Sequence, residues 1–101
     1  MNVQHFVSQI INDKAFLLEA CRHIPAEMLD KSNEGVEQGD TSNPDVFADL
    51  FFPAAQAMGV DATHEQVNAE FQGQLRELGG FGKMRFMFRL IRTMAKVKKG
   101  A

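Results

Sequence analysis

Apolar residues recur at steps of three and four over most of the chain, which is the spacing of helix faces that pack on a core. No segment alternates apolar and polar residues with period two, and the common hairpin turns Asn-Gly and Asp-Gly do not occur. The length of 101 residues suits one small domain. The sequence therefore predicts an all-α fold: a small bundle of three to four short helices with a cationic amphipathic C-terminal helix.

The first predicted helix covers about residues 2–22, where the segment VQHFVSQIINDKAFLLEAC keeps helical spacing. A break is possible at Asn12-Asp13, where the carboxylate of Asp13 would cap a second helical segment. Pro25 ends the helix, because the residue before a proline is pushed out of the helical conformation. A short helical turn is predicted next, over residues 26–30.

A polar loop over residues 31–43 separates the first helix from the second. The second helix is predicted to begin with Asn43 as its cap and Pro44 at its first helical position. Pro53 should kink this helix, because proline lacks an amide hydrogen and clashes with the preceding turn. Gly59 is expected to end it in a left-handed conformation.

A third helix is predicted to begin at Thr63, which has the capping-box spacing to Gln66. Its apolar stripe is expected to end at the double glycine Gly79-Gly80. The residues of this stripe are Val67, Phe71, Leu75 and Leu78.

Charge divides the chain at the double glycine. Residues 1–80 contain all thirteen Asp and Glu with four basic residues, a net charge of −9, whereas residues 81–101 contain seven Lys or Arg and no acid, a net charge of +7. Such asymmetry is typical of a tail that acts separately from the body. The sequence thus predicts an acidic helical domain, residues 1–80, and a cationic amphipathic tail, residues 81–101.

The tail is predicted to be helical in the intact chain, with basic residues on one face and Met, Phe and Leu on the other. Such a helix suits an anionic membrane, where cations meet the headgroups and apolar side chains enter the interface. Alternatively, it packs its apolar stripe on the domain core and leaves its basic face in water. The residues expected to bind a membrane or a partner are Lys83, Arg85, Phe86, Arg89, Leu90, Arg92, Met94, Lys96 and Lys99.

Few residues suit catalysis or metal binding. Cys21 is the one cysteine, and its place on the apolar stripe of the first helix favours a packing role over a nucleophilic one. No two of the three histidines, His5, His23 and His64, have the i, i+4 spacing that puts two metal ligands on one helix face. We therefore expect no enzyme, no catalytic residue, no metal and no cofactor. Nucleic-acid binding is disfavoured, because a body with a charge of −9 would repel the phosphate backbone.

The stretches FVSQIINDKAFLLEA and DVFADLFFPAAQAMGVDATHEQVNAEF carry a family resemblance over about residues 3–79. Their order of apolar helix, glycine, short acidic link, threonine cap and Glu-containing helix resembles the Nif-eleven-type leader domain. This domain occurs in cyanobacterial nitrogen-fixation proteins and in precursors of ribosomally synthesised, modified peptides. In the family the leader often ends in a double glycine, and the residues after it form the product.

The resemblance implies a bacteriocin-like precursor whose acidic leader is recognised by a modifying enzyme and by the peptidase of an export ABC transporter. The precursor would be cytoplasmic and its cationic product secreted and membrane-active. The N-terminus lacks the pattern of a signal peptide, and no run approaches the roughly 20 apolar residues of a membrane span. Cleavage would involve Gly79, Gly80 and Phe81, and leader recognition would involve Phe71, Leu75 and Leu78.

Three features depart from the family pattern. Pro53 interrupts a helix that the family keeps smooth, and the apolar residues before the glycines lie one place off the usual register. The product would contain no Cys or Ser and one Thr, Thr93, so lanthionine or thiazole chemistry has almost nothing to act on. The alternative function is an intact all-α adaptor that binds a membrane surface or a protein partner through its basic C-terminal helix, with the glycines serving as an inter-helix turn.

Overall fold

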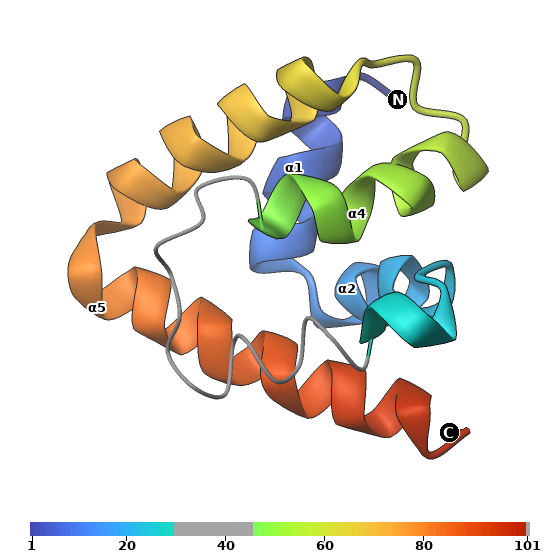
Figure 1. The fold of residues 1–101 in the computed structure, drawn as a ribbon. Coiled ribbons are helices and arrows are strands. Elements are labelled where there is room, and N and C mark those ends of the chain that lie inside the picture. Colours follow the sequence, from blue (N-terminus) through green and yellow to red (C-terminus); the bar gives the residue numbers. More distant parts are fainter. Residues whose placement is uncertain (30–45, 101) are drawn as a thin grey trace.

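The computed structural model describes residues 1–29 and 46–100, whose secondary structure is helical without a strand among them (Figure 1). The predicted all-α fold is confirmed. The predicted loop over residues 31–43 and the cap at Asn43 and Pro44 lie outside the described residues. The helices are α1 (Val3–Asn12), α2 (Lys14–Arg22), α4 (Val46–Ala57) and α5 (His64–Lys98), with a further helical turn over residues 26–29.

The predicted break in the first helix is confirmed at Asp13, which separates α1 from α2. The backbone of Asp13 is extended, and its carboxylate accepts hydrogen bonds from the amides of Ala15, at 2.9 Å, and Phe16, at 3.3 Å. These are amides that the first turn of a helix leaves without a partner. Asn2 caps α1 in the same way by accepting from the amide of His5 at 2.7 Å.

The second predicted helix is observed as α4, which continues past Pro53 to Ala57 as one helix. Gly59 follows it with a φ of 79°, the left-handed conformation predicted for the cap. The amide of Gly59 donates to the carbonyl of Gln56, and the amide of Val60 donates to that of Ala55. This pair of hydrogen bonds is the Schellman motif, which satisfies carbonyls at a helix end.

α5 consists of two arms that meet at a sharp corner, visible at the left of Figure 1. The capping box at its start is confirmed, because the side chains of Thr63 and Gln66 each accept from the other's backbone amide. Gly79, with φ 74° and ψ 177°, leaves the helical conformation and turns the chain. We call residues 64–78 the first arm and residues 80–98 the second arm.

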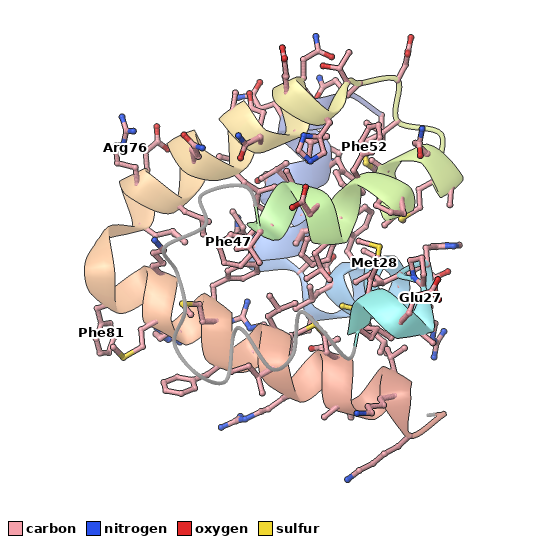
Figure 2. All side chains as sticks on the ribbon, in the orientation of Figure 1. Glu27, Met28, Phe47, Phe52, Arg76 and Phe81 are labelled. Atoms are coloured by element: carbon pink, nitrogen blue, oxygen red, sulfur yellow. The ribbon has the colours of Figure 1, made fainter. Side chains whose placement is uncertain are left out.

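The core lies between the two arms of α5, which enclose α1, α2 and α4 (Figure 1). Phe47 on α4 connects the arms, since its ring centroid lies 5.9 Å from that of Phe71 on the first arm and 5.7 Å from that of Phe86 on the second (Figure 2). Aromatic pairs at this separation add to the free energy of folding beyond their buried area. The second arm therefore belongs to the same core as the helices before the double glycine.

Candidate functional site

The inner side of the second arm is buried. Phe86, Leu90 and Met94, spaced by four residues, retain 2% or less of their exposed surface and contact the core formed by α1, α2 and α4. The helix predicted for the tail is confirmed, since α5 continues to Lys98. These three side chains were among the residues expected to bind a membrane or partner. In the folded chain they are covered, so binding through them requires the second arm to leave the core.

The outer side of the second arm carries exposed apolar side chains. Phe81 is 78% exposed, Met84 55% and Phe88 57%, and Figure 2 shows Phe81 at the corner, pointing away from the core. The sequence interpretation placed Met84 on the apolar face of the tail helix, opposite the basic residues, and gave no role to Phe88. Phe81, Met84 and Phe88 are spaced by three and four residues, so the sequence already contained a second apolar stripe on this helix.

Basic side chains lie on the same outer side. Arg85, Arg92 and Lys96 are exposed along the second arm, and Lys99, which follows the arm, is exposed as well. Together with the three apolar residues they make a surface that combines aromatic rings with positive charge. We define the outer face of the second arm as Phe81, Met84, Arg85, Phe88, Arg92 and Lys96.

A groove of about 650 Å³ runs between the N-terminal part of α2 and the second arm. We call it the basic groove. In the part of the chain that the structure describes, its lining combines five cations from two helices with an aromatic ring and apolar side chains, without a carboxylate. The lining residues are Lys14, Ala15, Leu18, Arg85, Phe88, Arg89, Arg92, Thr93 and Lys96.

Arg89 connects the basic groove to α1. Its guanidinium donates from Nη1 to the carbonyl oxygen of Ile11 at 2.9 Å, two residues before the break at Asp13. That carbonyl lies in the last turn of α1, where helix carbonyls lack an intrahelical donor and a positive charge is favourable. Arg89 therefore fixes the second arm against the end of α1, and its role is in part structural. Lys83, also expected to bind, is half-buried near the corner.

The corner of α5 is accessible. Gly79, Gly80 and Phe81, the residues named for cleavage, are all exposed. Of the residues named for leader recognition, Leu78 is 36% exposed and lies next to the corner, whereas Phe71 and Leu75 are buried in the core on the first arm. These latter two side chains are not available to another protein while the chain is folded.

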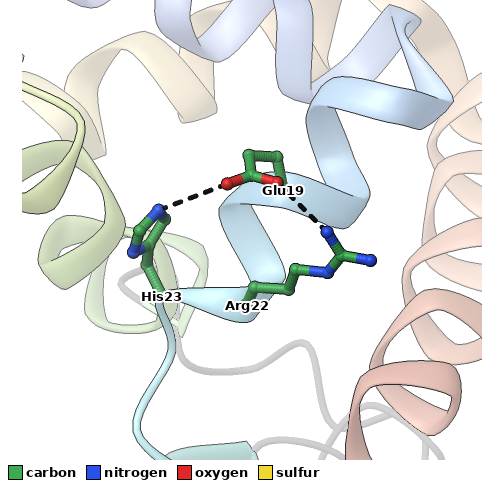
Figure 3. Close-up of polar contacts among 3 residues, drawn as sticks. All are labelled: Glu19, Arg22 and His23. Atoms are coloured by element: carbon green, nitrogen blue, oxygen red, sulfur yellow. Dashed lines mark hydrogen bonds and ion pairs between the residues drawn. The ribbon is translucent and has the colours of Figure 1, made fainter. Parts of the chain in front are cut away.

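Two of the three histidines, His23 and His64, lie beside carboxylates. His64, at the start of α5, has its Nε2 2.6 Å from a carboxylate oxygen of Asp49 on α4. At the end of α2, Glu19 lies between Arg22, at 3.4 Å, and His23, at 3.7 Å (Figure 3). Within residues 1–29 and 46–100, no three His, Cys, Asp or Glu side chains gather where they could hold a metal ion. No described helix is long and apolar enough to cross a membrane.

Cys21 is fully buried, and burial raises the pKa of its thiol from 9.0 to about 12. A neutral thiol is a poor nucleophile. We expect Cys21 to resist an aromatic disulfide reagent at pH 8 in the folded protein and to react at once in denaturant. Because its pKa is higher when folded, the stability that the neutral thiol contributes is complete below pH 9 and is lost as the pH rises from 9 to 12. Rapid labelling of the folded protein at pH 8 would contradict this prediction.

Comparison with known proteins gives this chain no relative. The resemblance to the Nif-eleven-type leader therefore stays a prediction that rests on the residues quoted for it. No protein-family model, no curated protein and no solved structure matches the chain.

Proposed function

We propose that the intact, folded protein binds an anionic membrane surface through the outer face of the second arm. The observation that carries this proposal is the division of the arm into two sides. Its inner side is occupied by the core through Phe86, Leu90 and Met94, while Phe81 and Phe88 remain exposed among cations. The tail does not need to be released to present a membrane-binding surface.

The chemistry of the outer face suits the boundary between headgroups and acyl chains. Aromatic and apolar side chains gain free energy by leaving water at that boundary, and each Lys or Arg near an anionic surface contributes about 1 kcal/mol. Phe81 lies at the corner of α5 and Phe88 about two turns further along the second arm, and both exposed rings can enter the interface. The net charge of +7 on residues 81–101 is concentrated on this arm, so the acidic body can face away from the membrane.

Sedimentation of the full chain with vesicles tests the proposal. We expect binding to anionic vesicles, little binding to neutral ones, and a loss of binding as salt is raised, because salt screens exposed charges. Phe81→Ser should weaken partitioning about tenfold, since an exposed ring that enters the interface is removed. Gln72→Ser, an exposed position on the first arm, is the matched control and should change nothing. Equal binding to neutral and anionic vesicles would exclude this function.

A second candidate function is the precursor that the sequence suggested, cut after Gly80 to release residues 81–101. It is supported by the exposure of Gly79, Gly80 and Phe81 at the corner, where a peptidase of an export transporter could reach them. Mass spectrometry of the culture medium, with the export system present, should then detect a species that begins at Phe81. Gly80→Val is a suitable variant for testing cleavage, because a Cβ at Gly80 meets nothing within 4 Å. Secretion that stops in this variant, while vesicle binding by the full chain is unchanged, would favour the precursor. Detection of full-length protein alone would count against it.

A further inference from the structure

We propose that the basic groove is a binding site for an organic anion that carries more than one phosphate group, with Lys14 on α2 and Arg85, Arg92 and Lys96 on the second arm as phosphate-binding residues. Where the phosphates belong to a lipid headgroup, this inference rests on the proposed function and gives it a specific ligand. Where they belong to a soluble molecule, it stands independently.

The groove is a product of the tertiary fold. Lys14 reaches it from α2, and the other cations reach it from α5. An isolated amphipathic tail would carry Arg85, Arg92 and Lys96 on its surface and would lack both Lys14 and the opposing wall. The contribution of Lys14 therefore separates binding in a formed groove from general attraction to a basic helix.

The described lining of the groove supplies no acidic side chain to neutralise its cations. Among residues 1–29 and 46–100, five cations surround one concavity and no carboxylate lines it, and the pairs that the structure describes for Glu19 and Asp49 join other partners. Gathering like charges beside a low-dielectric wall costs free energy, and a multivalent anion removes that cost. Arg89 fixes the position of the second arm, since its Nη1 donates a hydrogen bond to the carbonyl of Ile11.

The size and walls of the groove favour an organic phosphate over a free phosphate ion. About 650 Å³ lies within the range of about 300–1,000 Å³ that small-molecule sites occupy, whereas a single inorganic phosphate would leave most of that space empty. Phe88 with Ala15 and Leu18 supplies apolar wall between the cations. A ring or glycerol unit with several phosphates matches this mixture, because its carbon atoms can contact the wall while its phosphates meet the Arg and Lys side chains.

Titration calorimetry on the full chain tests binding of a soluble ligand, with inositol 1,4,5-trisphosphate and inorganic phosphate as probes. We expect the trisphosphate to bind at least tenfold more tightly than inorganic phosphate. Lys14→Gln should weaken trisphosphate binding about fivefold, the effect of one lysine near concentrated anionic charge. Arg76→Gln removes the same charge from an exposed position of the first arm outside the groove, and should leave the affinity unchanged. Thermal unfolding of both variants confirms that each remains folded.

A second experiment measures binding to vesicles and compares phosphatidylserine with phosphatidylinositol 4,5-bisphosphate at equal total surface charge. A preference for the bisphosphate that Lys14→Gln removes and Arg76→Gln keeps would identify a lipid ligand. Trisphosphate binding that depends on Lys14 without any vesicle binding would support the groove while refuting the membrane function. Equal effects of the two variants, or no binding of the trisphosphate, would overturn the proposed phosphate site in the groove. If vesicle binding then follows total surface charge alone, the proposed membrane function is still supported.

Discussion

A chain that ends after Gly80 is expected to lose its cooperative fold. The cut removes Phe86, Leu90 and Met94 from the core, and Phe47 thereby loses the Phe86 ring that it contacts. Truncating one buried side chain of this size costs about 2–5 kcal/mol. Three such losses are comparable with the whole free energy of unfolding of a small domain, about 5–15 kcal/mol. Residues 1–80 should therefore be a loosely packed, partly helical chain.

Far-ultraviolet circular dichroism during heating and the dispersion of amide signals in NMR spectra measure this outcome. A chain that ends after Lys99 is the matched control, because it keeps every buried residue of the second arm and should unfold cooperatively. Adding a synthetic peptide of residues 81–101 to the 1–80 fragment should restore dispersed signals, and a peptide with Leu90→Ser should not. A sharp unfolding transition of the 1–80 fragment by itself would refute this prediction and would strengthen the view of residues 1–80 as an autonomous leader.

Gly79→Ala is expected to lower the free energy of unfolding by about 1–3 kcal/mol. At φ 74° and ψ 177° the backbone of Gly79 adopts a conformation that is essentially restricted to glycine, because a Cβ would be strained there. A Cβ at this position meets nothing within 4 Å, so the cost arises from the backbone and not from a clash with neighbours. Relief of the strain requires the corner to straighten, which would pull the second arm away from the core.

Gly80→Ala is the matched control for the corner. Gly80 is exposed, begins the second arm without a positive φ, and meets nothing within 4 Å of an added Cβ. Alanine favours a helix over glycine by about 1 kcal/mol, so this variant should be as stable as the parent chain or slightly more so. Urea unfolding of the two variants side by side checks the pair. Equal stability of Gly79→Ala and the parent chain would mean that the corner does not depend on glycine.

The corner also links the two candidate functions, because its glycines have different roles in each. In the membrane-binding protein, Gly79 sets the direction of the second arm and brings Arg85 and Arg92 opposite Lys14. In the precursor, the same glycines mark the cut. Gly80→Val separates the two, since it alters the cleavage sequence and leaves the turn at Gly79 in place.

Helix positions could be predicted from the sequence because the interactions that fix them are local. Asp13 caps α2, Thr63 and Gln66 form the capping box of α5, and Gly59 ends α4, each as predicted. These contacts join residues two to five positions apart, so the amino acids alone specify them. The low reactivity expected of Cys21 also followed from its place on an apolar stripe. The buried location of that residue in the structure agrees with this expectation.

The tertiary structure decided which side of the second arm is covered. The arm carries two apolar stripes, one through Phe86 and Leu90 and the other through Phe81 and Phe88, and helical spacing alone ranks neither above the other. The core covers the first stripe, where the ring of Phe86 packs beside that of Phe47, and leaves the second exposed. Lys14 came to face the arm through packing between segments remote in the sequence. The sequence by itself determined the helices, their caps and the division of charge, whereas the groove and the exposed aromatic surface required contacts that no local pattern encodes.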